Sequence, residues 1–152
     1  MRKIKVSRNT TGYEEDFYAW TIEQAKLLRS GEFSRIDTLN VAEEIESVGR
    51  RDRRELADRI EDLIVELLKW LCQPGARCGN WHSEILQQRF EIEHIINDSP
   101  SLREFTEERL AEAYSDARER VVEELRLLQP EFPAECPYSL DQLLSHSFVP
   151  EG

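Results

Sequence analysis

Two charged residues interrupt the apolar faces that the sequence predicts for two different helices. Asp52 lies on the line between Val48 and Leu56, and Arg89 lies at the corresponding place on a later helix. Burying a charge without a partner is costly, so we expect both side chains to be mostly buried and paired, with one another or with a neighbouring helix. An Asp52–Arg89 pair could line a small-molecule pocket, or it could be a structural salt bridge that fixes the register of the helices. We favour the salt bridge.

The histidines suggest a second kind of chemistry, metal binding. Glu91 and His94 have the Glu-x-x-His spacing that di-iron carboxylate bundles use. Such a centre needs two of these motifs and two further glutamates, whereas neither His82 nor His146 has a glutamate three residues before it. We therefore predict that the protein has no metal site.

Arg89 and His94 also have the Arg-x4-His spacing of the HEPN helical-bundle ribonucleases, which use these two side chains on RNA. On one helix the two residues are about 140° apart, so that one faces the core and the other faces solvent. The chain also carries a net charge of -11 at pH 7, which repels phosphate groups at long range. A ribonuclease or toxin-type bundle that uses Arg89 and His94 is therefore the alternative hypothesis. We do not expect nucleic acid as a partner.

Nucleophilic catalysis by a cysteine would require a positioned base. Cys78 and His82 are the one pair of this kind that is close in sequence, and no third residue is placed to orient the histidine. The three cysteines include no CxxC pair, so we expect thiols rather than disulfides or a zinc site. Because no glycine-rich phosphate loop or other cofactor motif is present, we predict no cofactor and favour a protein without enzymatic activity.

Helices must position all of these side chains, and the longest predicted helix covers Val41–Leu71. Its apolar residues recur at steps of three, four or eight: Val41, Ile45, Val48, Leu56, Ile60, Leu63, Leu67 and Leu71. Only a helix places such a series on one side. Gln73-Pro74-Gly75 is a strong stop signal. Gly49, inside the helix, indicates a kink or a close approach by another helix.

Similar patterns predict three more main helices and a short final one. The first covers Tyr13–Ser30, and the second covers Trp81–Asn97. The third begins at Ser99-Pro100-Ser101 and ends before Pro130, and the short final helix lies within Pro137–Leu144. The expected inner face of the first consists of Phe17, Trp20, Thr21, Ala25 and Leu28. No strand pattern is visible. We predict an all-α, up-and-down bundle of four main helices with a short C-terminal helix. It forms one domain over residues 13–150 and follows a loose basic tail at residues 1–12.

The end of the long helix is apolar on nearly all sides, because Ile64, Leu68 and Cys72 lie about 100° to 180° away from Ile45. A helix of this kind is normally enclosed by other elements. Either the C-terminal segment, which contains Phe132 and several later apolar residues, covers it, or a second subunit does so across a two-fold axis. We favour the intramolecular cover, and hence a monomer over a homodimer.

The sequence also bears on the compartment. No apolar stretch approaches the ~20 residues of a membrane span. The first residues, MRKIKVSRNTTG, carry charge but lack the apolar core of a secretory signal. We therefore expect a cytoplasmic protein that does not associate with membranes.

Several short sequences occur in an order that resembles a known family. They include Tyr13-Glu14-Glu15-Asp16-Phe17-Tyr18-Ala19-Trp20-Thr21, Glu43-Glu44-Ile45-Glu46-Ser47-Val48-Gly49, Leu67-Leu68-Lys69-Trp70 and Ser99-Pro100-Ser101-Leu102. Over nearly its whole length the chain resembles the bacterial domain-of-unknown-function family 29. This resemblance implies a small all-helical bundle, but it supplies no activity and no functional residues. We predict a non-enzymatic interaction or scaffold module whose partners are proteins.

Overall fold

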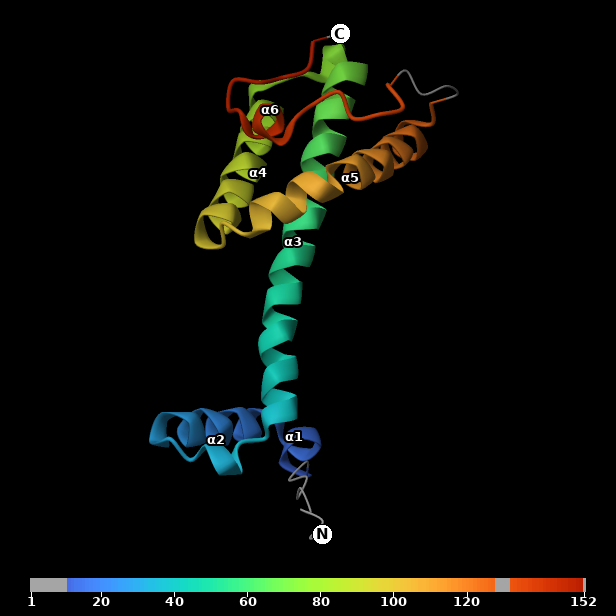
Figure 1. Cartoon of the computed structure of the whole chain (residues 1–152). Coiled ribbons are helices and arrows are strands. Elements are labelled where there is room, and N and C mark those ends of the chain that lie inside the picture. The colour runs from blue at the N-terminus through green and yellow to red at the C-terminus, as the bar shows by residue number, and fades with distance from the viewer. Residues whose placement is uncertain (1–10, 128–131, 152) are drawn as a thin grey trace. The chain divides into compact units, whose positions relative to one another are not determined.

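The computed structural model describes residues 11–127 and 132–151, and its regular structure in these residues is entirely helical (Figure 1). The helices are α1 (Thr11–Glu15), α2 (Phe17–Ser30), α3 (Thr38–Cys72), α4 (Gly79–Asp98), α5 (Leu102–Leu125) and α6 (Leu140–Leu144), with the short 3-10 helices η1 (Phe33–Arg35) and η2 (Pro74–Ala76). The predicted all-α fold is confirmed. It has four main helices, one of them unusually long, and a short C-terminal helix.

The first predicted helix, Tyr13–Ser30, consists of two helices, α1 and α2. The division falls at Asp16, whose carboxylate accepts a hydrogen bond of 2.9 Å from the backbone N–H of Ala19 and caps the start of α2. The predicted end of this segment at Ser30 is correct, since the next residue, Gly31, adopts the left-handed conformation with φ 74° that ends a helix. Most of the predicted tail, residues 1–10, lies outside the described residues, and Thr11 already belongs to α1.

The long helix α3 is continuous through Gly49 and contains 35 residues. It starts slightly earlier than predicted and ends before Gln73, where Pro74 and Gly75 form the short helix η2. Helix α5 ends at Leu125, earlier than predicted, where Arg126 takes up the left-handed conformation with φ 52°.

The contacts within the chain divide it into two compact units. The N-terminal unit extends to Arg51, and the C-terminal unit begins at Asp52. Helix α3 contributes residues to both units. The division was not anticipated from the sequence, and the single domain over residues 13–150 stays a prediction.

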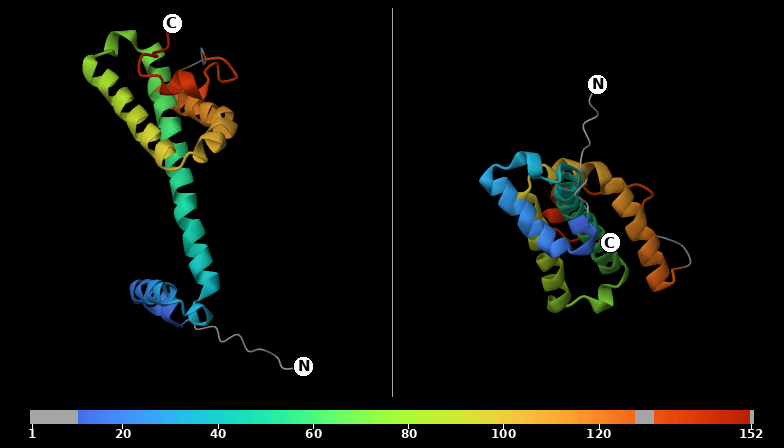
Figure 2. Two further views of the ribbon diagram at one scale, coloured as in Figure 1. Left: turned by 60° about the vertical axis from the view of Figure 1, so that its left-hand side comes forward. Right: turned by 90° about the horizontal axis from the view of Figure 1, so that it is seen from below.

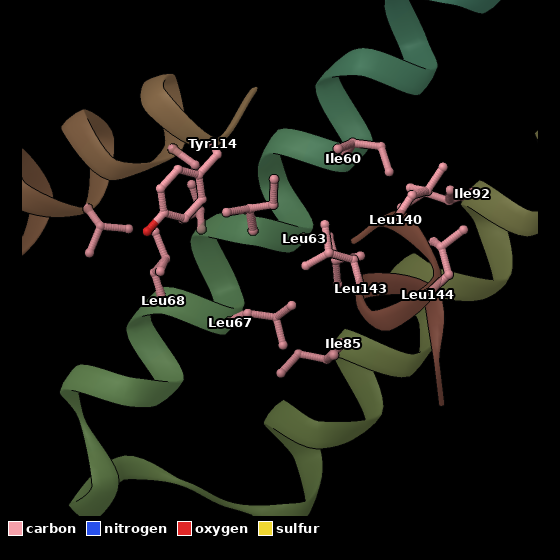
Figure 3. Packing of buried hydrophobic residues seen from close by; sticks show 14 of the residues in the cluster. Ile60, Leu63, Leu67, Leu68, Ile85, Ile92, Tyr114, Leu140, Leu143 and Leu144 are labelled. Atoms are coloured by element: carbon pink, nitrogen blue, oxygen red, sulfur yellow. The ribbon is translucent and has the colours of Figure 1, made fainter. Parts of the chain in front are cut away.

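The C-terminal unit holds the hydrophobic core of the described residues. Helices α4 and α5 pack against the second part of α3, and α6 contacts both α4 and α5 (Figures 1 and 2). Side chains from all four helices converge in one cluster (Figure 3). The most deeply buried are Leu56, Ile60, Leu63, Ile64, Leu67, Leu68, Ile85, Ile92, Tyr114, Ala117, Val121 and Leu143. Burial of this apolar surface is the main force that assembles the unit.

The chain itself covers the end of α3. Ile64 and Leu68 are exposed by no more than 1%, and the C-terminal segment contributes Phe132 and Leu143 to the cluster that encloses them. This arrangement is the intramolecular cover that the sequence favours, and the end of α3 therefore gives no reason to invoke a second subunit. Separately, no helix in the described ranges is long and apolar enough to cross a membrane.

Candidate functional site

Arg89 is the largest fully buried side chain of the core, with an exposed fraction of 0%. Its Nε donates a hydrogen bond of 2.7 Å to the carbonyl oxygen of Leu143, and its Nη2 donates one of 2.6 Å to the carbonyl oxygen of Phe148. Its Nη1 has no hydrogen-bond partner among the described residues. Burial lowers the pKa of the Arg89 guanidinium from its ordinary value, and the charge of Glu93 opposes that shift.

These two bonds give Arg89 a structural role. Leu143 lies in the last turn of α6, whose carbonyl groups have no partner within the helix, and Phe148 follows in the irregular C-terminal segment. A guanidinium has five N–H donors and can satisfy several such carbonyls together. Arg89 therefore ties the C-terminal segment to α4.

Asp52 does not pair with Arg89. Its side chain is only half-buried on α3, and no hydrogen bond or ion pair joins the two residues in the described part of the chain. Arg89 donates its described hydrogen bonds to backbone carbonyl groups, and the carboxylate whose charge acts on it is that of Glu93. The sequence pattern placed Arg89 on the correct face of its helix, but it could not identify partners that lie more than fifty residues away.

The predicted ribonuclease pair is separated in the same way. The side chain of His94 is 74% exposed, and its Nε2 lies 3.5 Å from the carboxylate of Asp98, one turn further along α4. Arg89, by contrast, points into the core. One chain therefore does not bring the two side chains together in a groove where both could contact RNA.

The remaining candidates show little chemistry. Cys78 is exposed and His82 is half-buried, and the one bond recorded between them joins backbone groups. Within residues 11–127 and 132–151, no group of three or more His, Cys, Asp or Glu side chains could hold a metal ion. A surface cleft of about 430 Å³ includes Arg103 and Asp141, but these two charges already pair with one another at 2.6 Å.

The N-terminal unit has a different character, because its large apolar side chains face solvent. Of the large hydrophobic residues that are exposed in the described chain, all but Phe90 lie before Arg51. They are Phe17, Tyr18, Ile22, Leu28, Phe33, Leu39, Ile45 and Val48, and we call them the N-terminal apolar surface. Tyr18 is 76% exposed and Leu39 is 75% exposed. Exposed apolar patches mark interaction sites in soluble domains, so the unit that carries these residues is the candidate interaction region.

The elements beneath this surface are held together by specific contacts. The rings of Tyr13, Phe17 and Trp20 pack together, with centroids 4.8 to 5.7 Å apart. Gln24 accepts a hydrogen bond of 2.8 Å from the backbone N–H of Asp37, just before α3 begins. The hydroxyl group of Tyr13 donates a hydrogen bond to the carboxylate of Glu44, and this bond raises the pKa of Tyr13. The exposed side chains are thus presented by an ordered scaffold.

Part of this surface was assigned wrongly from the sequence. Phe17 and Leu28 were expected on the inner face of the first helix, yet they are 48% and 46% exposed. Ile45 and Val48 belong to the apolar side of α3, yet they are 67% and 54% exposed. The spacing of apolar residues reports which side of a helix is apolar. It does not report whether the same chain covers that side.

A comparison with protein families bears on the whole chain. The family model described as "Domain of unknown function DUF29" matches residues 12–149. The chain belongs to the DUF29 family. The match includes both units, so the N-terminal apolar surface lies within the DUF29 region. No curated protein and no solved structure was found to match the chain. Membership in DUF29 assigns no site residue, and the candidate site is therefore inferred from the geometry of the chain itself.

Proposed function

We propose that this DUF29 protein is a non-enzymatic interaction module that acts in the cytoplasm and binds protein through its N-terminal apolar surface. The observation that carries this proposal is the concentration of exposed large hydrophobic residues in the N-terminal unit. In the described part of the C-terminal unit, Phe90 is the only large hydrophobic residue that is exposed. A chain that can enclose its apolar side chains in one unit and exposes them in the other has a surface suited to a partner.

Several large apolar side chains of the N-terminal unit remain in contact with water. Full burial of a Leu, Ile or Phe side chain stabilises by roughly 1.5–3 kcal/mol. The exposed fractions of Tyr18, Phe33 and Leu39 are 76%, 68% and 75%, so each residue leaves more than two-thirds of its surface in water. A partner that covers several of these residues would recover this energy, and a few such residues dominate the affinity of most protein interfaces.

The ribonuclease alternative has weaker support. It needs Arg89 and His94 at one surface, and Arg89 donates both of its described hydrogen bonds to carbonyl groups inside the C-terminal unit. The charge of -11 also disfavours RNA as a ligand.

Affinity capture with matched variants tests the proposal. The wild-type chain, Tyr18→Glu and Phe33→Glu are each used as bait in a lysate of the native cell, and captured proteins are identified by mass spectrometry. We expect the two variants to lose a partner that the wild type retains, because each places a charge in an apolar contact. Phe90→Glu is the control, since Phe90 is 55% exposed but lies in the C-terminal unit. Identical captured sets for all four baits would contradict the proposal.

A further inference from the structure

Two residues of the N-terminal apolar surface on α3, Ile45 and Val48, form together with Val41 the pattern of a helix–helix seam. Val41, Ile45 and Val48 follow one another at steps of four and three, which places them on one side of the helix. Ile45 and Val48 are 67% and 54% exposed. Alternating steps of three and four are the repeat by which two helices pack along their length. This stripe is therefore suited to another helix.

The two edges of the stripe differ in a regular way. Glu44 and Arg51 lie on one edge, seven residues apart, and Ala42 and Gly49 lie on the other edge at the same spacing. Seven residues correspond to two turns, or about 10 Å, and no ion pair joins Glu44 and Arg51 among the described residues, although Glu43 and Arg50 pair at the same spacing. One edge therefore carries two opposite charges, and the other carries two small residues.

The two charged residues on this edge can still form ion pairs with another molecule. Among the described residues, Arg51 forms no ion pair, and Glu44 accepts a hydrogen bond from the hydroxyl group of Tyr13. By contrast, Arg50 on the opposite face already pairs with Glu43 and Glu46 within α3. The small-residue edge is open as well, because a Cβ atom at Gly49 would meet nothing within 4 Å.

A second copy of the same helix, running in the opposite direction, complements both edges. When two identical antiparallel helices are related by a two-fold axis between them, each edge faces the same edge of the partner. Glu44 then faces Arg51 of the second copy, and Arg51 faces Glu44 of the second copy. On the other edge Ala42 faces Gly49 of the second copy, so the backbones can approach closely.

A parallel arrangement does not give this match. In a parallel pair the Glu44–Arg51 edge of one helix faces the Ala42–Gly49 edge of the other, and neither charge meets an opposite charge. The order of charges therefore selects the antiparallel pair. It also explains a glycine in the middle of a long helix, where it would otherwise cost about 1 kcal/mol relative to alanine.

We propose that α3 pairs with α3 of a second copy of this chain in antiparallel fashion, with the two-fold axis near residues 46 and 47. This inference rests on the proposed interaction function and names one partner for that surface. The stripe is short compared with the interface of a permanent dimer, so the association is weak and depends on concentration.

Charge exchange between two variants provides the decisive test. Glu44→Arg leaves two positive charges on the edge, and Arg51→Glu leaves two negative charges. In its own antiparallel dimer each variant juxtaposes like charges, so we expect its dissociation constant to rise about tenfold or more. In an equimolar mixture both pairs become attractive, and the heterodimer should regain the wild-type affinity to within about threefold.

Sedimentation equilibrium from about 10 μM to about 1 mM protein measures these affinities. For the wild type and for the mixture we expect the mass to rise from 17.9 kDa towards twice that value. Tyr13→Phe is the matched control, because it removes the bond to Glu44 without changing the charge of the edge. It should associate like the wild type. Rescue by mixing also demonstrates that both variants are folded.

Two results would overturn the antiparallel pair. One is a wild-type mass that stays at 17.9 kDa throughout, and the other is association of either variant alone at wild-type strength. If the wild type is monomeric while Tyr18→Glu and Phe33→Glu still lose a captured protein, the self-pairing is wrong and the interaction function stands. If capture is unchanged in those variants but mixing restores the dimer, the surface serves self-association alone.

Discussion

The two parts of α3 differ in their environment although they share one apolar repeat. In the C-terminal unit Ile60 and Leu63 lie on the apolar side of α3 and are exposed by no more than 1%. In the N-terminal unit Ile45, on the same side of the same helix, is 67% exposed. The difference arises because α4, α5 and α6 cover the second part and none of them belongs to the unit that contains Ile45. An apolar stripe thus shows which side of a helix favours contact with another element. Whether the same chain supplies that element depends on the rest of the fold.

The largest expected effect tests this contrast with one residue type. Ile60→Ala removes a side chain that is 1% exposed and leaves a cavity, so we expect a loss of about 2–5 kcal/mol in the free energy of unfolding. Ile45→Ala, at a site that is 67% exposed, should change it by no more than about 0.5 kcal/mol. Chemical denaturation monitored by circular dichroism measures both. Equal losses would show that Ile45 is covered in solution.

The second prediction concerns the tie between α4 and the C-terminal segment. Arg89→Ala leaves the carbonyl groups of Leu143 and Phe148 without their donors and creates a cavity, so we expect a loss of about 2–4 kcal/mol. Asp52→Ala should cost less than about 1 kcal/mol, because Asp52 is half-buried and has no described partner. Thermal unfolding of the two variants decides this point. A larger loss for Asp52→Ala than for Arg89→Ala would contradict the assignment.

The smallest expected effect concerns the open edge of α3. Gly49→Ala should stabilise the chain by up to about 1 kcal/mol, because alanine favours the helix and its Cβ atom meets no neighbour within 4 Å. Denaturation at low micromolar concentration, where the proposed pair dissociates, measures the change. Gly75→Ala is a comparison outside the long helices, where we expect less gain. A loss of stability at Gly49 would mean that this edge is already in contact within one chain.

The candidate site shows how far local patterns reach. The series of apolar residues correctly predicted that Arg89 faces the core, since about 3.6 residues per turn fix the side of a helix on which each residue lies. The pattern did not identify its partners, because Leu143 and Phe148 are brought to α4 by the folding of a distant segment. Asp52 was considered as a partner of Arg89 because both charged residues interrupt predicted apolar helix faces. Asp52 and Arg89 lie on different helices, and no local rule could test that match.

The sequence alone determined the helices and most of their ends. Gly31 ends α2 because it adopts a positive φ, which glycine tolerates and a helix does not continue through. Gln73-Pro74-Gly75 ends α3 because Pro74 has no backbone N–H to continue the helical hydrogen bonds. The tertiary structure alone decided which apolar residues are enclosed. Ile64 is buried since a distant C-terminal segment packs in the same cluster, whereas Val48 is 54% exposed and does not belong to that cluster. Helical hydrogen bonds join residues four apart, but burial depends on segments that are far apart in the chain.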